Sequence, residues 1–129
     1  MFDVSDKTNV TELATKIFTS SEVFSPAETN HKAIFVDIKN NVIGIPYKAY
    51  TDDGEKSYYS IFKYDTDKNE FIQVNNLNLY NYDYTDFSDE YYSRGLYIGD
   101  YFYIVTQDTI YAYNYDNFEH TSTLEIPTK

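Results

Sequence analysis

Hydrophobic and aromatic residues alternate with polar residues in short runs along this chain, and each run ends in a cluster of Asp, Asn, Lys, Ser or Gly. Alternation with a period of two predicts half-buried β-strands, and the polar clusters predict tight turns. Four such runs lie at residues 31–37, 42–50, 58–65 and 70–79. Because short turns join antiparallel neighbours, this part of the chain predicts one four-stranded antiparallel sheet.

The turns between these strands carry residues that tolerate unusual backbone angles. The pair Asn40 and Asn41 is compatible with positive φ and predicts a two-residue hairpin loop. Asp53 followed by Gly54 marks the second hairpin. Aspartates such as Asp65 are explained by hydrogen bonds from their side chains to the local backbone, so we expect them to form turns rather than bind ligands.

A unit of strand, polar turn and strand at residues 61–74 recurs at residues 1–13 and 110–124. A unit that recurs at a spacing of roughly 50–60 residues indicates a repeat architecture, with β-propeller blades as the leading option. The four-strand order also restarts after residue 92. Its runs lie at 93–98, 101–106, 109–115 and 119–126.

We therefore predict an all-β fold of antiparallel four-stranded blades, a partial β-propeller of about two and a half blades that forms a single domain over residues 1–129. The expected parts are a half blade at 1–18, a blade at 31–79, an acidic and Tyr-rich interblade loop at 80–92, and a blade at 93–127. Propellers contain about four to eight blades, so we expect the chain to be a fragment of a larger ring. Its open blade edges predict self-association, whereas a well-folded monomer would favour a self-contained sandwich.

The composition supports strands and narrows the range of partners. Tyr contributes 16 residues and Phe 9, and aromatic side chains suit the half-buried surface of a sheet. The formal net charge of −11 argues against nucleic acid and bare anionic membrane as partners. The sequence has no run of about 18 apolar residues, so we expect no transmembrane helix in it. It also shows no basic region followed by an apolar region, the pattern of a signal peptide. The absence of Cys excludes a disulfide framework and Cys-ligated metal sites.

Four segments carry, in order along the chain, a pattern typical of a known family. They are residues 1–9, 30–35, 43–46 and 93–127. Together they resemble the C-terminal β-propeller domain, distantly related to WD40 repeats, of a family of secreted or cell-surface bacterial proteins. The resemblance covers nearly the whole chain, although Val10 stands where the family usually has Pro. It implies a propeller fold and a location outside a bacterial cell or on its surface, and it implies no activity.

The loop at 80–92 holds the candidate binding residues. Its rings and carboxylates suit stacking and hydrogen bonding to a glycan or a protein, and the predicted contacts are Tyr82, Tyr84, Asp86 and Phe87. Its acidic side chains are the hard oxygen ligands that Ca²⁺ prefers, and the predicted ligands are Asp83, Asp86, Asp89 and Glu90. Their spacing lacks the EF-hand order, so a solvated loop without metal remains the alternative. Rings that pack onto the blades are the alternative to exposed stacking surfaces.

Motifs for catalysis are absent from the sequence. It has no G-x-S-x-G elbow, Cys nucleophile or phosphate-binding glycine loop. His31 and His120 occupy unrelated repeat positions, which argues against a shared metal site. The predicted function is a non-catalytic binding or scaffold module that contacts a protein or a glycan and uses no cofactor other than Ca²⁺. The alternatives are a glycan-acting enzyme with carboxylates at the propeller centre and a purely structural repeat array.

Overall fold

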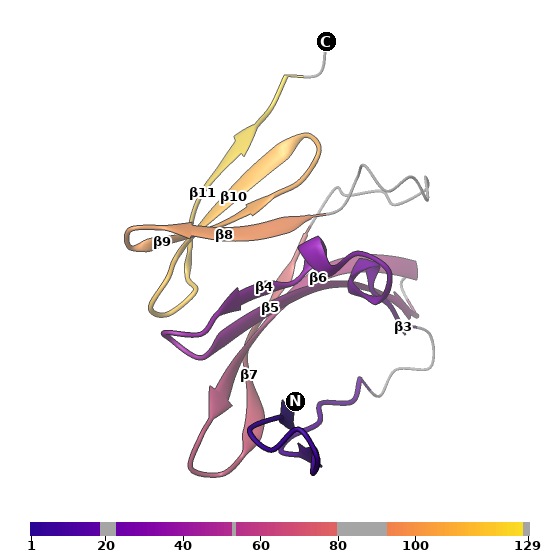
Figure 1. Cartoon of the computed structure of the whole chain (residues 1–129). Coiled ribbons are helices and arrows are strands. Elements are labelled where there is room, and N and C mark those ends of the chain that lie inside the picture. The colour runs from indigo at the N-terminus through magenta and orange to yellow at the C-terminus, as the bar shows by residue number, and fades with distance from the viewer. Residues whose placement is uncertain (19–22, 53, 80–92, 128–129) are drawn as a thin grey trace.

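The computed structural model describes residues 1–18, 23–52, 54–79 and 93–127 (Figure 1). In these residues the regular elements are β-strands, all of whose pairings are antiparallel, and two short 3₁₀ turns. Figure 1 shows the N-terminal segment (residues 1–18) at the bottom, a first blade in the middle and a second blade at the top. The prediction of an all-β fold built from antiparallel blades is confirmed.

The first blade contains β3 (Val23–Phe24), β4 (Phe35–Asp37), β5 (Val42–Thr51), β6 (Gly54–Asp65) and β7 (Glu70–Asn78). The strands β5, β6 and β7 are neighbours in sequence order, and their pairings are antiparallel. Both β3 and β4 pair with the other side of β5, towards opposite ends of that strand. The edge strand of this blade is therefore split in two.

Pro46 explains the split. It lies on β5 between the residues that pair with β3 and those that pair with β4. Proline has no N–H to donate to a neighbouring strand, so a ladder on this side is interrupted here. The Pro46 carbonyl instead accepts a hydrogen bond of 2.7 Å from the Ser25 hydroxyl. The segment that follows β3 therefore leaves the ladder opposite Pro46 and pairs with β5 again from Phe35 onwards.

Between β3 and β4 the chain forms two 3₁₀ turns, η1 (Pro26–Glu28) and η2 (His31–Ala33). Asn30 caps η2, because its side chain accepts a hydrogen bond of 3.0 Å from the Lys32 N–H. This local bond competes with strand formation. The strand predicted at 31–37 is therefore wrong in its first half, and strand pairing begins at Phe35 in β4.

The second blade is a four-stranded sheet of β8 (Arg94–Ile98), β9 (Tyr101–Val105), β10 (Thr109–Asn114) and β11 (His120–Glu125). Each strand pairs antiparallel with the next one along the chain. These four strands correspond to the four alternating runs predicted after residue 92.

The N-terminal segment has less regular structure than the repeat pattern predicts. Its strands β1 (Phe2–Asp3) and β2 (Thr11–Glu12) pair over two residues each. After them the chain runs under the first blade, where the ring of Phe18 lies 4.9 Å from that of Tyr47 and 6.0 Å from that of Phe62. The segment thus covers the face of the first blade that points away from the second.

The main core lies between the two blades. Tyr59 and Ile61 of β6 and Phe102 and Ile104 of β9 are fully buried, and the rings of Tyr59 and Phe102 are 5.9 Å apart. The same cluster includes Val42, Leu77, Leu79, Tyr113 and Phe118. Full burial of one such side chain stabilises a fold by roughly 1.5–3 kcal/mol, so this core fixes how one blade sits on the other.

Gly95 of β8 lies against this core. A Cβ added there would lie 2.8 Å from Cζ of Phe102 and closer still to the Tyr59 hydroxyl. Both rings are enclosed, so we expect Gly95→Ala to lower the free energy of unfolding by about 1–3 kcal/mol, measured by urea denaturation. Leu96→Ala, at the next and exposed position of β8, is the control and should cost less than about 1 kcal/mol. Equal losses in the two variants would contradict the close approach.

Candidate functional site

One turn geometry recurs at the same end of both blades. The turns after β4, β6 and β10 begin with Asp37, Asp65 and Asn114. In each turn Oδ1 of that residue accepts hydrogen bonds of 2.9–3.3 Å from the backbone N–H groups two and three residues further along. Such bonds hold a turn in one conformation. The prediction that Asp65 serves turn formation is confirmed.

The fifth residue of each of these turns has a positive φ. The angle is 55° at Asn41, 53° at Asn69 and 56° at Phe118. Asn adopts this conformation readily, whereas an aromatic residue adopts it at a cost in free energy. In the third turn, the contacts of the Phe118 side chain must therefore offset a free-energy cost of the backbone that the Asn residues of the other two turns largely avoid.

The turn between β4 and β5 is longer than predicted. Asp37 pairs with Val42, so the strands are joined by residues 38–41. The backbone already bends after Asp37, because its carboxylate accepts the N–H groups of the turn. The two-residue loop predicted at Asn40 and Asn41 is therefore wrong, and of this pair Asn41 alone has a positive φ.

Tyr115, the second residue of the third turn, links the two blades. Its hydroxyl donates a hydrogen bond of 2.6 Å to Oδ2 of Asp37 in the first blade. Its backbone N–H donates to the Asp100 carbonyl at 2.9 Å. Its ring stacks on Tyr97, with centroids 4.9 Å apart and planes at 4°. We call the hydrogen bond between Tyr115 and Asp37 the interblade latch.

Asp37 is 6% exposed although it is a carboxylic acid. Its carboxylate also accepts hydrogen bonds from the Lys39 N–H, from the Asn40 N–H and, at 2.7 Å, from the Asn40 side-chain amide. The bond from Tyr115 is the main cause that lowers the pKa of Asp37, and the bonds from Asn40 and Lys39 add to it. Burial, followed by the bond to Asp37, raises the pKa of Tyr115. The latch thus joins an ionised carboxylate to a neutral phenol at neutral pH.

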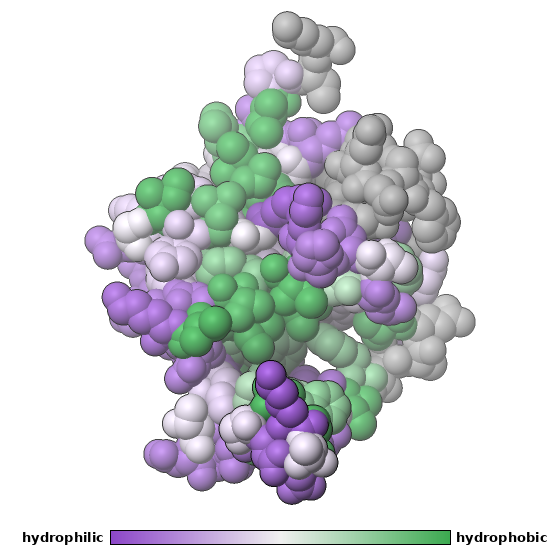
Figure 2. Space-filling model, viewed as in Figure 1, coloured by the Kyte–Doolittle hydropathy of each residue, from purple (hydrophilic) through white to green (hydrophobic). Residues whose placement is uncertain are grey.

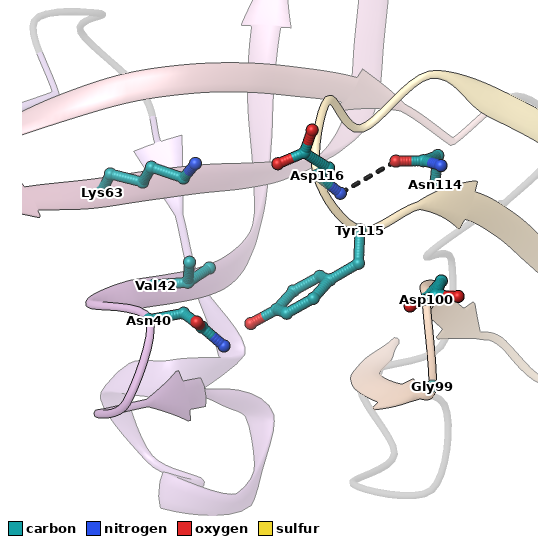
Figure 3. Close-up of a pocket in the computed structure, with 8 residues that line it drawn as sticks. All are labelled: Asn40, Val42, Lys63, Gly99, Asp100, Asn114, Tyr115 and Asp116. Atoms are coloured by element: carbon teal, nitrogen blue, oxygen red, sulfur yellow. Dashed lines mark hydrogen bonds between the residues drawn. The ribbon is translucent and has the colours of Figure 1, made fainter.

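A half-open pocket of about 420 Å³ lies beside the latch, between the blades (Figure 3). Its walls are Asn40, Val42 and Lys63 from the first blade and Gly99, Asp100, Asn114, Tyr115 and Asp116 from the second. Figure 3 shows the Tyr115 ring extending from its turn towards Asn40, and the Lys63 side chain directed towards the side where Asp116 lies. The pocket therefore forms only where both blades meet.

The lining groups of this pocket are chemically mixed. Amides both donate and accept hydrogen bonds, carboxylates accept them, and an ammonium group donates them. Such a set suits a ligand rich in hydroxyl groups, because each hydroxyl also donates and accepts, and an aromatic ring stacks on the apolar face of a sugar. The Asn114 side chain is held by the Asp116 N–H at 2.9 Å (Figure 3), so this wall is fixed before a ligand arrives.

The binding residues predicted in the loop at 80–92 lie outside the described residues. This concerns the contacts Tyr82, Tyr84, Asp86 and Phe87 and the calcium ligands Asp83, Asp86, Asp89 and Glu90. Their roles stay predictions. Across residues 1–18, 23–52, 54–79 and 93–127, no three His, Asp or Glu side chains are grouped as a metal would need. The same part of the chain contains no helix of the length and hydrophobicity required to cross a membrane.

The predicted site residues do not include this pocket, although the sequence carries a signal for it. Asp or Asn ends an alternating run at 37, 65 and 114, and the residue four positions later closes the turn. In the first two copies that closing residue is Asn, which suits an exposed turn. In the third copy, Tyr115 and Phe118 occupy the second and fifth positions. Aromatic residues at these positions indicate a turn that folds onto a neighbouring blade rather than into solvent.

A comparison with known families agrees with the architecture. A family model described as a beta propeller domain matches residues 1–118. No curated protein and no solved structure matches this chain. The matched segment includes the N-terminal segment, the whole first blade and most of the second. The chain therefore belongs to the beta propeller domain family.

Proposed function

We propose that the chain is a non-catalytic binding module of a bacterial secreted or cell-surface protein, and that its interblade pocket holds part of a neutral glycan. The observation that carries the proposal is the pocket, in which amide, carboxylate and ammonium groups converge beside the Tyr115 ring. The resemblance of four segments to secreted and cell-surface propeller proteins supports the location.

Binding without catalysis agrees with the chemistry of Asp37. Hydrolysis of a glycosidic bond needs a carboxylic acid that still holds a proton near neutral pH. The pKa of Asp37 is lowered instead, chiefly by the Tyr115 hydroxyl. Both of its oxygens are also engaged, one in its own turn and one in the latch. Asp37 therefore supports the wall of the pocket and is unsuited to donate a proton.

Asp116 provides the sharpest test of the pocket. It is exposed and lines the cavity, and its side chain can accept hydrogen bonds from ligand hydroxyl groups. A hydrogen bond to a charged group contributes about 1.5 kcal/mol, so we expect Asp116→Ala to weaken binding roughly tenfold. A panel of neutral oligosaccharides screened on an array, followed by calorimetric titration of the best binder, would measure this loss.

The chain offers a matched control in Asp67. This residue occupies the same position in the turn after β6, where its N–H donates to Asp65 at 3.0 Å as that of Asp116 donates to Asn114. Asp67 does not line the pocket. Asp67→Ala should leave the affinity unchanged, and Lys63→Ala should reduce it. The proposal fails if no neutral glycan binds, or if the bound glycan is insensitive to both Asp116→Ala and Lys63→Ala.

A further inference from the structure

The face of the second blade that points away from the first blade is also largely apolar. Directly opposed residues in a ladder lie on the same face of a sheet. Leu96 is opposite Tyr103 and Ile98 is opposite Tyr101, while Ile110 is opposite both Val105 and Leu124. We call these residues the outer face: Leu96, Ile98, Tyr101, Tyr103, Val105, Ile110 and Leu124. Ile98 is 66% exposed and Leu124 62%.

The first blade shows what covers such a face. Ile61 and Ile110 occupy the same position in the repeat, at the start of the units 61–74 and 110–124. Ile61 is fully buried, because the second blade packs over it. Ile110 is half-buried and belongs to the outer face. The repeat therefore indicates that a further unit of this fold fits on the outer face.

The opposite end of the molecule also exposes apolar side chains. The N-terminal segment lies below the first blade, and the second blade lies above it (Figure 1). Ile17 is 73% exposed, Val4 63%, Phe2 59% and Val10 53%. In the space-filling view, apolar surface is seen over the second blade in the upper half of Figure 2. The chain thus has an uncovered apolar surface at each end of its stack of blades.

The distribution of charge favours contact between unlike ends. The second blade carries Asp100, Asp108, Asp116, Glu119 and Glu125 against the single cation Arg94. With five acids and one cation the second blade has a net charge of −4, so two second blades brought together repel each other. The N-terminal segment carries Lys7 and Lys16 against Asp3, Asp6 and Glu12, so its side chains sum to a charge of only −1. An outer face therefore meets less repulsion at the N-terminal segment of another copy than at a second outer face.

We propose that the outer face is the docking surface for a second copy of this chain, which binds through its N-terminal segment. The contact is head to tail and repeats the stacking of the second blade on the first. Such a heterologous contact generates a closed ring where the rotation closes and a longer assembly where it does not. Self-association then uses the faces of the blades, in contrast to the open strand edges expected from the sequence.

Two complementary variants test the direction of docking. Ile98→Glu with Leu124→Glu places charge on the outer face, and Val10→Glu with Ile17→Glu places charge on the N-terminal segment. All four side chains are exposed, so the fold should be retained, which circular dichroism would check. A buried unpaired carboxylate opposes docking.

By size exclusion with light scattering, each variant alone should have the 15.2 kDa mass of one chain. Their equimolar mixture should have twice that mass, because one intact surface of each kind remains.

A single variant serves as the control. Ile38 is 84% exposed in the turn between β4 and β5 and belongs to neither surface. Ile38→Glu should assemble as the unmodified chain does, with a mass that rises with concentration. A monomeric unmodified chain would overturn the proposal and leave the outer face to another partner. A mixture that stays monomeric, or an outer-face variant that still assembles, would overturn it as well, and the latter would favour strand edges.

Discussion

Replacing Phe118 with Ala is expected to lower the free energy of unfolding by about 3 kcal/mol or more, because it removes a buried aromatic ring from the core between the blades. Phe118 is 3% exposed, and its ring packs edge to face against Phe102 and Tyr115 with centroids 5.7 Å away in each case. Its carbonyl also accepts a hydrogen bond of 3.1 Å from the Asn75 side chain of the first blade. Urea denaturation followed by Tyr fluorescence would measure the loss.

The positive φ of Phe118 leads to a second expectation, which concerns the order of stability of the Gly and Ala variants. Glycine commonly destabilises a protein more than alanine does, but at a φ of 56° it avoids the conformational cost that any Cβ brings. We therefore expect Phe118→Gly to be more stable than Phe118→Ala by about 1 kcal/mol. Asn69, at the matching position of an exposed turn, is the control, and Asn69→Gly should likewise exceed Asn69→Ala. The reverse order at both positions would show that these turns relax to ordinary φ values.

Replacing Tyr115 with Phe is expected to cost about 1.5 kcal/mol at neutral pH, because it deletes the latch while keeping the ring that stacks on Tyr97. A hydrogen bond to an ionised carboxylate is worth more than one between neutral groups. Chemical denaturation of the two proteins at pH 7 would measure the difference. Tyr64→Phe is the control, since its hydroxyl bonds to the neutral Asn69 amide at 2.7 Å in an exposed turn, and it should cost clearly less.

The latch also predicts how stability changes with pH. The pKa of Asp37 is lowered from 3.8 in the folded protein, so its contribution is fully present above pH 3.8 and is lost as the pH falls through the folded value. The pKa of Tyr115 is raised from 10.0, so its contribution is present below pH 10 and is lost at higher pH. The difference between the unmodified chain and Tyr115→Phe should therefore be largest at intermediate pH. A difference that stays constant into strong acid would contradict an ionised Asp37 in the latch.

Strand periodicity and the repeat were sufficient to predict the blades, because a sheet with one face on a core imposes a period of two on its sequence. The runs at 101–106 and 109–115, which are rich in aromatic and β-branched residues, correspond to β9 and β10. The failures have local causes. At His31 a side-chain cap from Asn30 competes with the strand, and at Asn40 the carboxylate of Asp37 begins the turn early. Neither effect changes the hydrophobic pattern on which the prediction depended.

The pocket and the latch could not be predicted in the same way, because they depend on contacts between residues far apart in the sequence. Tyr115 and Asp37 are 78 positions apart and meet only when the second blade sits on the first. Tyr113 and Phe102 are buried in the structure, but the sequence does not say which partner an aromatic residue in a turn will find. An Asp or Asn that begins each turn is visible in the sequence, whereas the angle between the blades is set by the packing of the core.

The split edge of the first blade bears on how this domain can change over evolutionary time. Because β3 and β4 pair independently with β5, the register of one does not depend on the number of residues that separate it from the other. The chain between Phe24 and Phe35 can therefore gain or lose residues without shifting any side chain of the blade to the wrong face. We expect relatives of this protein to differ in length between these two positions more than in any hairpin of the same blade.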